Sequence, residues 1–436
     1  MFGERYVSRT PGSRSFFEEA KKVLPGGVSY SIRYFDPYPI YVSKARGQKI
    51  WDVDGNGYTD YWIGHGALIM GHSYLPVIEA VKEQFEEYLH VGFPHEWEVR
   101  LAKQVIKMVD SVKLFRFTNS GTEAAMYSTR LARAFTKKKF IGKFEGGWHG
   151  GYDCLHIGVY PPYDVPGSLG ILDDCLKYTL VLPYNDLEGV RQKVKGVDLA
   201  AIIVEPVLGA GGSIPAERGF LKGLRELCDE MDALLIFDEV ITGFRLSPGG
   251  AQKLYGVTPD LTVFGKILGG GEFPVGGFGG REDIMELLDQ LKYPEAHERA
   301  FQGGTFAANP ITTRAGYTLL KELDENPEIY QKINSLGEKA MKEIEDLFQR
   351  YDFKAHVTGI GSMFGIHFTP EKPKDARAAQ TLKDQKLAES FFKHMLDNGV
   401  LYMTQSMPHL YVSAAHTSED IDNLVSFVED FIRKTR

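Results

Sequence analysis

The chain has 436 residues, of which 43% are hydrophobic and 25% are charged, as is usual for a folded protein with a large apolar core. A formal net charge of −8 argues against a general nucleic-acid binder and against a protein that attaches to anionic membranes, since both need a basic face. We therefore expect small molecules as partners, with no nucleic acid and no membrane.

Cysteine usage and hydropathy bear on the compartment. Cys154, Cys175 and Cys228 are scattered and have no CxxC spacing, which predicts reduced thiols in a cytoplasmic protein. The N-terminal segment is charged throughout and lacks the apolar stretch of a secretory signal, and nowhere do about eighteen apolar residues follow one another. His95 and Glu96 lack the second histidine of an HExxH motif, so we expect no metal site.

Residues 1–70 form an N-terminal segment that we expect to pack with the smaller of two domains. The dipeptides Asp54-Gly55 and Asn56-Gly57 are strong turn signals, and they predict a pair of strands around this point.

Residues 71–325 are predicted to form a large domain in which short apolar runs alternate with helical patterns. Several runs, such as AAIIV and LLIF, lack polar alternation, which is typical of parallel strands covered on both faces. The predicted strands are 114–118, 140–144, 200–204, 234–238 and 261–264.

Residues 326–436 predict a smaller α+β domain, which the N-terminal segment completes. Helical patterns at 333–348 and 387–396 flank an extended stretch, HVTGIGSMFGIHFT. Asn398-Gly399 is typical of a helix C-cap, and Thr417 with Asp420 resembles an N-terminal capping box. The predicted class is therefore α/β, with a mostly parallel sheet between helices in the large domain.

The segment NSGTEAA, residues 119–125, follows the predicted strand LFRFT and precedes a helical pattern. A turn of small residues at a helix start points several backbone N–H groups at one spot, where the helix dipole favours an anion. The hydroxyls of Ser120 and Thr122 would add donors to such a phosphate site. Helix capping alone also explains these two residues.

Asp238 ends the apolar run LLIFD, where α/β folds place their ligands. A carboxylate there can pair with a protonated ring nitrogen, a metal ion or a ribose. An aspartate that caps the next turn is an equally reasonable interpretation.

Lys266 follows the apolar run LTVFG and precedes three glycines, Gly269 to Gly271. A lysine beside a buried sheet edge either extends its amine to solvent or has a lowered pKa and acts as a nucleophile. Trp148 and His149 lie among glycines in GGWHG, which suggests a stacking platform, although both residue types are common in cores.

In this order, these motifs resemble those of the class III aminotransferases, pyridoxal-phosphate enzymes of fold type I. The resemblance covers SGTEA, an aromatic–His–Gly, VEP, DEV, GK before glycines and GGTF–NP, and it extends over nearly the whole chain. It implies that residues 71–325 bind pyridoxal 5'-phosphate. It also implies that Lys266 holds this cofactor as a Schiff base and that Asp238 keeps the ring nitrogen protonated.

The remaining cofactor contacts are likewise implied by the resemblance. Thr305 would complete the phosphate site from the partner subunit, so the family likeness implies a homodimer with shared active sites. The residues implied to hold the phosphate are Ser120, Gly121 and Thr122, those implied to enclose the ring are Trp148 and Val240, and those implied to line the pocket are Glu205 and His149.

Within the family, the chain is most similar to the aminomutases that act on glutamate 1-semialdehyde. Arg33 falls on their carboxylate-binding arginine, a contact suited to a guanidinium. The chain departs from their pattern at Tyr30, at His65 in place of tryptophan or tyrosine, and at Pro408 in place of glutamate. Ser168 is the one clear serine kept from their gate loop. We expect Arg33, Tyr30, His65 and Ser168 to bind the substrate.

These departures favour an aminotransferase that moves an amino group from a carboxylate-bearing donor to an oxo acceptor by a ping-pong mechanism. The aminomutase reaction, which exchanges amino groups within one molecule, is the alternative. An amino-acid racemase is a third hypothesis, because it shares the deprotonation at the α-carbon. A binding protein that keeps the fold without activity is disfavoured by the presence of both Lys266 and Asp238.

Overall fold

The computed structural model describes residues 2–402 and 409–435. The chain divides into two compact units: one comprises Met1–Tyr74, Lys332–Pro373 and Leu382–Arg436, and the other comprises Leu75–Gln331 and Lys374–Thr381. Among the described residues, no helix is long and apolar enough to cross a membrane.

The larger unit, Leu75–Gln331 with Lys374–Thr381, is built on a seven-stranded sheet of order β4-β12-β11-β10-β7-β5-β6. Strand β12 is antiparallel to both of its neighbours, and every other adjacent pair is parallel. The strands are β4 (Leu114–Thr118), β5 (Phe140–Phe144), β6 (Thr179–Leu182), β7 (Leu199–Val204), β10 (Leu234–Asp238), β11 (Leu261–Gly265) and β12 (Gly276–Gly280). The predicted mostly parallel α/β sheet is confirmed, and β6 and β12 were not predicted.

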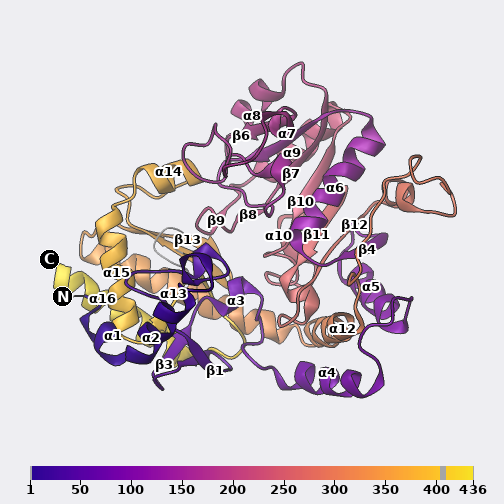
Figure 1. The fold of residues 1–436 in the computed structure, drawn as a ribbon. Coiled ribbons are helices and arrows are strands. Elements are labelled where there is room, and N and C mark those ends of the chain that lie inside the picture. Colours follow the sequence, from indigo (N-terminus) through magenta and orange to yellow (C-terminus); the bar gives the residue numbers. More distant parts are fainter. Residues whose placement is uncertain (1, 403–408, 436) are drawn as a thin grey trace. The chain divides into compact units, whose positions relative to one another are not determined.

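Both faces of this sheet are buried, as the lack of polar alternation predicts. In β7 and β10, alternate residues enter different core clusters: Ile203 and Ile236 belong to one, and Ile202 and Leu235 to the other. Helix α6 (Gly121–Thr136) packs on the first face, where Figure 1 shows it beside β10 and β11. Helices α8 (Leu187–Val194) and α9 (Phe220–Glu230) contribute to the second cluster.

Two further helices of the larger unit, α4 (Leu75–Glu87) and α5 (Glu96–Met108), pack on a third, α12 (Pro310–Glu325). The shorter elements are η3 (Asp153–Leu155), α7 (Asp173–Leu176), β8 (Val207–Leu208), β9 (Ile214–Pro215), α10 (Gly250–Tyr255), η4 (Lys266–Gly269), α11 (Glu282–Met285), η5 (Glu286–Leu288) and α14 (Ala376–Thr381).

The smaller unit contains a four-stranded sheet, β1-β2-β3-β15, and a three-stranded sheet, β13-β14-β16. Its strands are β1 (Val42–Arg46), β2 (Lys49–Asp52), β3 (Gly57–Asp60), β13 (His356–Ile360), β14 (Met363–His367), β15 (Val400–Leu401) and β16 (Leu410–Tyr411). Its helices are α1 (Glu4–Arg9), α2 (Pro11–Ala20), η1 (Pro25–Gly27), η2 (Ser31–Arg33), α3 (Ile63–Gly66), α15 (Gln385–Asp397), α16 (Ser418–Thr435) and, from Lys332 onward, α13 (Glu328–Arg350).

The local signals of the sequence are confirmed in this unit. Gly55, at φ 85°, lies in the turn between the antiparallel strands β2 and β3. Gly399, at φ 73°, follows the end of α15. Thr417 and Asp420 form the predicted capping box, because each side chain accepts a hydrogen bond from the backbone N–H of the other.

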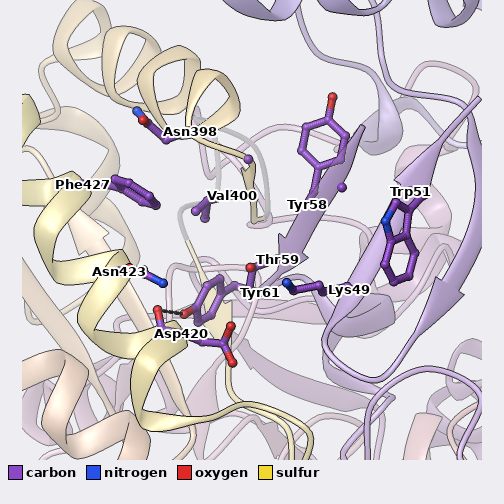
Figure 2. A pocket seen from close by; sticks show the side chains of 12 residues that line it. Lys49, Trp51, Tyr58, Thr59, Tyr61, Asn398, Val400, Asp420, Asn423 and Phe427 are labelled. Atoms are coloured by element: carbon purple, nitrogen blue, oxygen red, sulfur yellow. Dashed lines mark hydrogen bonds between the residues drawn. The ribbon is translucent and has the colours of Figure 1, made fainter. Parts of the chain in front are cut away.

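A pocket of about 260 Å³ lies in the smaller unit between strands β2 and β3 and helix α16 (Figure 2). Its lining includes Trp51, Tyr58 and Phe427, and the Tyr61 hydroxyl donates a hydrogen bond of 2.8 Å to the Asp420 carbonyl. None of the site residues predicted from the sequence lines this pocket.

Candidate active site

All predicted cofactor residues of the larger unit except Thr305 gather at one edge of its sheet. The turn after β4 carries Ser120 to Thr122, the loop after β5 carries Trp148 and His149, and Glu205 directly follows β7. Asp238 ends β10, and Lys266 directly follows β11. Since β5, β7, β10 and β11 are parallel to one another, their carboxyl ends meet at the edge where α/β sheets bind ligands.

Asp238 and His149 form a buried pair at the centre of this edge. His149 Nδ1 lies 2.7 Å from Asp238 Oδ2, and the side chains are 1% and 4% exposed. Burial lowers the pKa of His149, against the opposing effect of Asp238. The neutral ring therefore donates its Nδ1 proton to the carboxylate, which leaves Nε2 as a bare acceptor. Within the described part of the chain, this buried Nε2 has no hydrogen-bond partner.

Glu205 ties two loops together beside this pair. Its Oε1 accepts a hydrogen bond of 2.8 Å from the Trp148 N–H, and its Oε2 accepts one of 2.9 Å from the Gly209 N–H. Burial, followed by the charge of Asp238, raises the pKa of Glu205 to about 8. Glu205 thus fixes the backbone of Trp148 and can hold a proton near neutral pH.

Lys266 has the surroundings of a reactive amine. Burial lowers its pKa, and the carboxylates of Asp238 and Glu205 act in the opposite direction. Its backbone has a φ of 49°, in the left-handed region that non-glycine residues seldom adopt. The prediction of a nucleophilic lysine is favoured over an amine extended into solvent, since desolvation increases the neutral, nucleophilic fraction.

The start of α6 offers an anion site. Ser120 Oγ accepts a hydrogen bond of 3.2 Å from Glu123 N–H, so the capping interpretation is confirmed. Capping leaves the N–H groups of Gly121 and Thr122 at the positive end of a 16-residue helix. A Cβ on Gly121 would lie 3.0 Å from Val240 Cγ2, so a side chain here would have to displace Val240 slightly.

Val240 and Thr122 connect the parts of this edge. A Cβ on Gly265 would lie 3.1 Å from Val240 Cγ1, which places Val240 between the α6 start and the end of β11, directly before Lys266. A Cβ on Gly150 would lie 2.0 Å from Thr122 Oγ1, so the loop after β5 packs directly on the α6 start.

Sequence reasoning missed Lys143, which is fully buried on β5 and lies in this site. Its Nζ donates hydrogen bonds of 2.9 Å to the carbonyls of Gly147 and Leu155. Burial lowers the pKa of Lys143 to about 7, although Glu205 and Asp238 oppose that change. A lysine inside the otherwise apolar run FIGKF was the available signal.

Two predicted residues of this unit are exposed and are not part of the cluster. Thr305 lies in the exposed segment before α12, and Ser168 lies in an exposed loop where its hydroxyl donates to the Leu169 carbonyl at 3.1 Å. Pro408 falls outside the described residues.

The predicted substrate residues of the smaller unit form a group of their own. The rings of Tyr30 and His65 are stacked with centroids 6.0 Å apart, and Trp62 lies 4.8 Å from His65. Arg33 ends the short helix η2, which begins directly after Tyr30. Desolvation raises the pKa of Tyr30, and the charge of Arg33 opposes this change. One exposed guanidinium thus adjoins an aromatic surface.

His65 is held by an unusual backbone. All four residues from Ile63 to Gly66 have positive φ angles, between 49° and 79°. Such angles are unfavourable for a β-branched residue and cost about 1–2 kcal/mol at each non-glycine position. Strain of this kind persists only where neighbouring contacts impose it, and it is concentrated at functional sites.

The match to known proteins agrees with this geometry. A family model described as aminotransferase class-III matches residues 30–432. The chain belongs to the class III aminotransferase family. Members of this family depend on pyridoxal phosphate. The fold type I architecture and the use of this cofactor, both expected from the motifs, are therefore confirmed.

Proteins similar to this chain include both aminomutases and a transaminase. A glutamate-1-semialdehyde 2,1-aminomutase of Aquifex aeolicus is 41% identical over 97% of this chain and 99% of its own. Another aminomutase, from Methanosarcina acetivorans, is 42% identical over 96% of this chain and 98% of its own. The crystal structure of an ω-transaminase from Sphaerobacter thermophilus is 34% identical, with a TM-score of 0.91 and 99% coverage of both chains.

The residues at the sheet edge suit this cofactor. The α6 start fits a phosphate, the amine of Lys266 fits an aldehyde, and the Asp238 carboxylate fits a protonated ring nitrogen. The orphaned Nε2 of His149 fits a site completed by a polar ligand, because a buried acceptor without a partner is costly.

Proposed function

We propose that this chain is a class III enzyme that transfers an amino group on a carboxylate-bearing substrate, as a glutamate-1-semialdehyde 2,1-aminomutase. The main support for amino-group chemistry is that Lys266, Asp238 and the α6 start lie together at one edge of the sheet. The aminomutase reaction, rather than the intermolecular transfer first expected, has the support of the curated relatives, which are about 40% identical over nearly full length.

Pyridoxal phosphate, when bound, supplies an aldehyde that links to amines and a ring that accepts electrons from a substrate carbon. Lys266 is the residue proposed to bond to it, and once a substrate amine has replaced Lys266 in that bond, the freed, desolvated amine would move a proton at the substrate carbon. Asp238 holds the proton on the ring nitrogen. His149, hydrogen-bonded to the same carboxylate, keeps Asp238 oriented.

The other proposed contacts bind and orient the cofactor. Gly121 and Thr122 donate their backbone N–H groups to the phosphate, and the hydroxyls of Ser120 and Thr122 add to them. Trp148 and Val240 enclose the ring. Glu205 fixes Trp148 through its backbone N–H.

Substrate recognition is proposed for the smaller unit. The guanidinium of Arg33 is suited to binding a carboxylate in a bidentate manner. Tyr30 and His65 present a stacked aromatic surface next to it. Ser168, on an exposed loop, is proposed to contact substrate when that loop covers it.

Intermolecular transfer between a donor and an oxo acceptor is the second candidate. The stacked pair of Tyr30 and His65, two positions where the chain departs from the aminomutase pattern, favours it. The similar ω-transaminase of known structure also favours it.

We also propose a homodimer in which Thr305 contributes to the partner's phosphate site. Thr305 is exposed in the single chain, and its neighbour Phe306 is 58% exposed. The rings of His90 and Phe306 lie 4.7 Å apart, so these segments share one surface. Sedimentation velocity should show a dimer, and a monomer that turns over substrate would contradict shared sites.

A half-reaction screen decides between the two candidates. The holoenzyme is mixed with single amino compounds, including glutamate 1-semialdehyde, while cofactor absorbance is followed and products are identified. An aminomutase converts the semialdehyde to 5-aminolevulinate without any oxo acceptor. If ordinary amino acids instead release oxo acids and leave the cofactor in its amine form, intermolecular transfer is correct. Chiral analysis without an acceptor tests for racemisation.

A further inference from the structure

Lys143 occupies a position where a lysine is costly. It lies on β5, between β7 and the edge strand β6 of the larger sheet, and its side chain has no exposed surface. Burying an ammonium among apolar strands is unfavourable unless its donors are used. The contacts of the Lys143 amine must therefore offset this cost.

Those contacts tie the two ends of one loop. Nζ lies 2.9 Å from the carbonyl of Gly147, directly before Trp148, and 2.9 Å from the carbonyl of Leu155, at the end of η3. Residues 148–150 have no regular secondary structure. Without this amine, the carbonyls of these two buried residues would lose the donor that binds both of them.

The same loop is also held by the carboxylates of the site. Glu205 accepts the Trp148 N–H, and Asp238 accepts the Nδ1 proton of His149. Both carboxylates also interact electrostatically with Lys143, as do His149 and the neighbouring His156. The loop is therefore fixed by one buried lysine and two buried acids.

We propose that Lys143 is a positioning residue of the cofactor site: its buried amine fixes both ends of the loop of residues 147–155, and so sets Trp148 and His149 relative to Asp238. It acts through this loop and not on substrate. The role is the same whether the enzyme transfers amino groups within one molecule or between two.

Three variants test the proposal. Lys143→Met removes the amine at similar volume, and Lys143→Gln keeps N–H donors without the charge. Lys193→Met is the matched control, because its exposed amine also donates to a backbone carbonyl, that of Val181 at 2.8 Å. Two measurements are made: hydrogen exchange in the cofactor-free protein, and the dissociation constant of pyridoxal phosphate.

In Lys143→Met, amides of residues 147–155 should exchange about tenfold faster, and the dissociation constant should rise about ten- to a hundredfold. Lys143→Gln should lie between this variant and the wild type, and Lys193→Met should match the wild type in both measurements. Wild-type exchange and wild-type cofactor binding in Lys143→Met would overturn the proposal. If that variant does not fold, the same two results in Lys143→Gln decide. Exchange without cofactor is independent of the proposed reaction.

Discussion

Replacing Asp60 by alanine tests whether this carboxylate imposes the left-handed turn at residues 63–66. Asp60 Oδ1 accepts hydrogen bonds from the N–H groups of Trp62 at 2.7 Å and Ile63 at 3.1 Å. Its Oδ2 lies 2.8 Å from His72 Nε2, and the residue is 4% exposed. The carboxylate thus binds both residues that lead into the strained segment.

The expected loss of stability follows from these partners. Alanine leaves two backbone N–H groups and one imidazole without their acceptor, and each such buried group costs about 1–3 kcal/mol. Relaxation of Ile63, at φ 49°, recovers about 1–2 kcal/mol of strain. The three groups together cost about 3–9 kcal/mol, so the net destabilisation should be about 2–7 kcal/mol. For a unit of this size, that corresponds to a melting temperature lower by about 4–28 °C.

The assay is thermal unfolding of Asp60→Ala and of Asp60→Asn, which keeps one carbonyl oxygen for the two N–H groups. The asparagine variant should lose less than half as much as the alanine variant. Because the turn carries His65, the alanine variant should also raise the KM of a carboxylate substrate. An alanine variant that melts within about 1 °C of the wild type would refute the claim that Asp60 holds the turn.

Three further predictions concern the larger unit and Arg33. Gly276→Ala should weaken pyridoxal-phosphate binding by at least about tenfold in a cofactor titration, because the added Cβ would lie 2.0 Å from the Ser120 carbonyl oxygen. Gly151→Ala is the control, because a Cβ at that position would have no atom within 4 Å. Burial raises the pKa of Glu205 from its ordinary value of 4.5 to about 8 in the folded protein, so this group makes the unfolding free energy of the cofactor-free protein fall as pH rises between these two values. Glu205→Gln should flatten the dependence of this free energy on pH, and an unchanged slope in denaturant titrations would contradict the assignment. Arg33→Ala should raise the KM of carboxylate substrates about tenfold or more while sparing simple amines, and equal losses for both would count against carboxylate recognition.

Most of the parallel strands of the main sheet could be predicted from the sequence, but its antiparallel strand β12 could not. Apolar runs such as LLIFD identify parallel strands, because burial on both faces leaves no polar alternation. Strand β12, with the sequence GGFGG, was missed because glycine has little preference for strands. In the structure only glycine fits there: a Cβ on Gly277 would lie 2.3 Å from Phe115 Cζ, and one on Gly280 would lie 2.1 Å from the Asp260 carbonyl oxygen.

The candidate site was predictable where a motif fixes the backbone. Asp238 and Lys266 follow apolar strands, so their place at the sheet edge follows from strand polarity. Lys143 was not predictable in this way, because its two carbonyl partners lie in a loop without a pattern. The left-handed backbone of His65 was likewise hidden, since contacts distant along the chain impose it, including the one between Gly66 and Tyr411.

Borohydride reduction of the holoenzyme, followed by digestion and mass spectrometry, tests the central claim most directly. Reduction makes the bond between cofactor and lysine permanent, so the modified peptide identifies the residue. The chain holds two lysines of lowered pKa at this site, Lys266 and Lys143. We predict the cofactor on Lys266, with Lys143 unmodified. A label on Lys143, or on neither lysine, would contradict the proposed arrangement of the site.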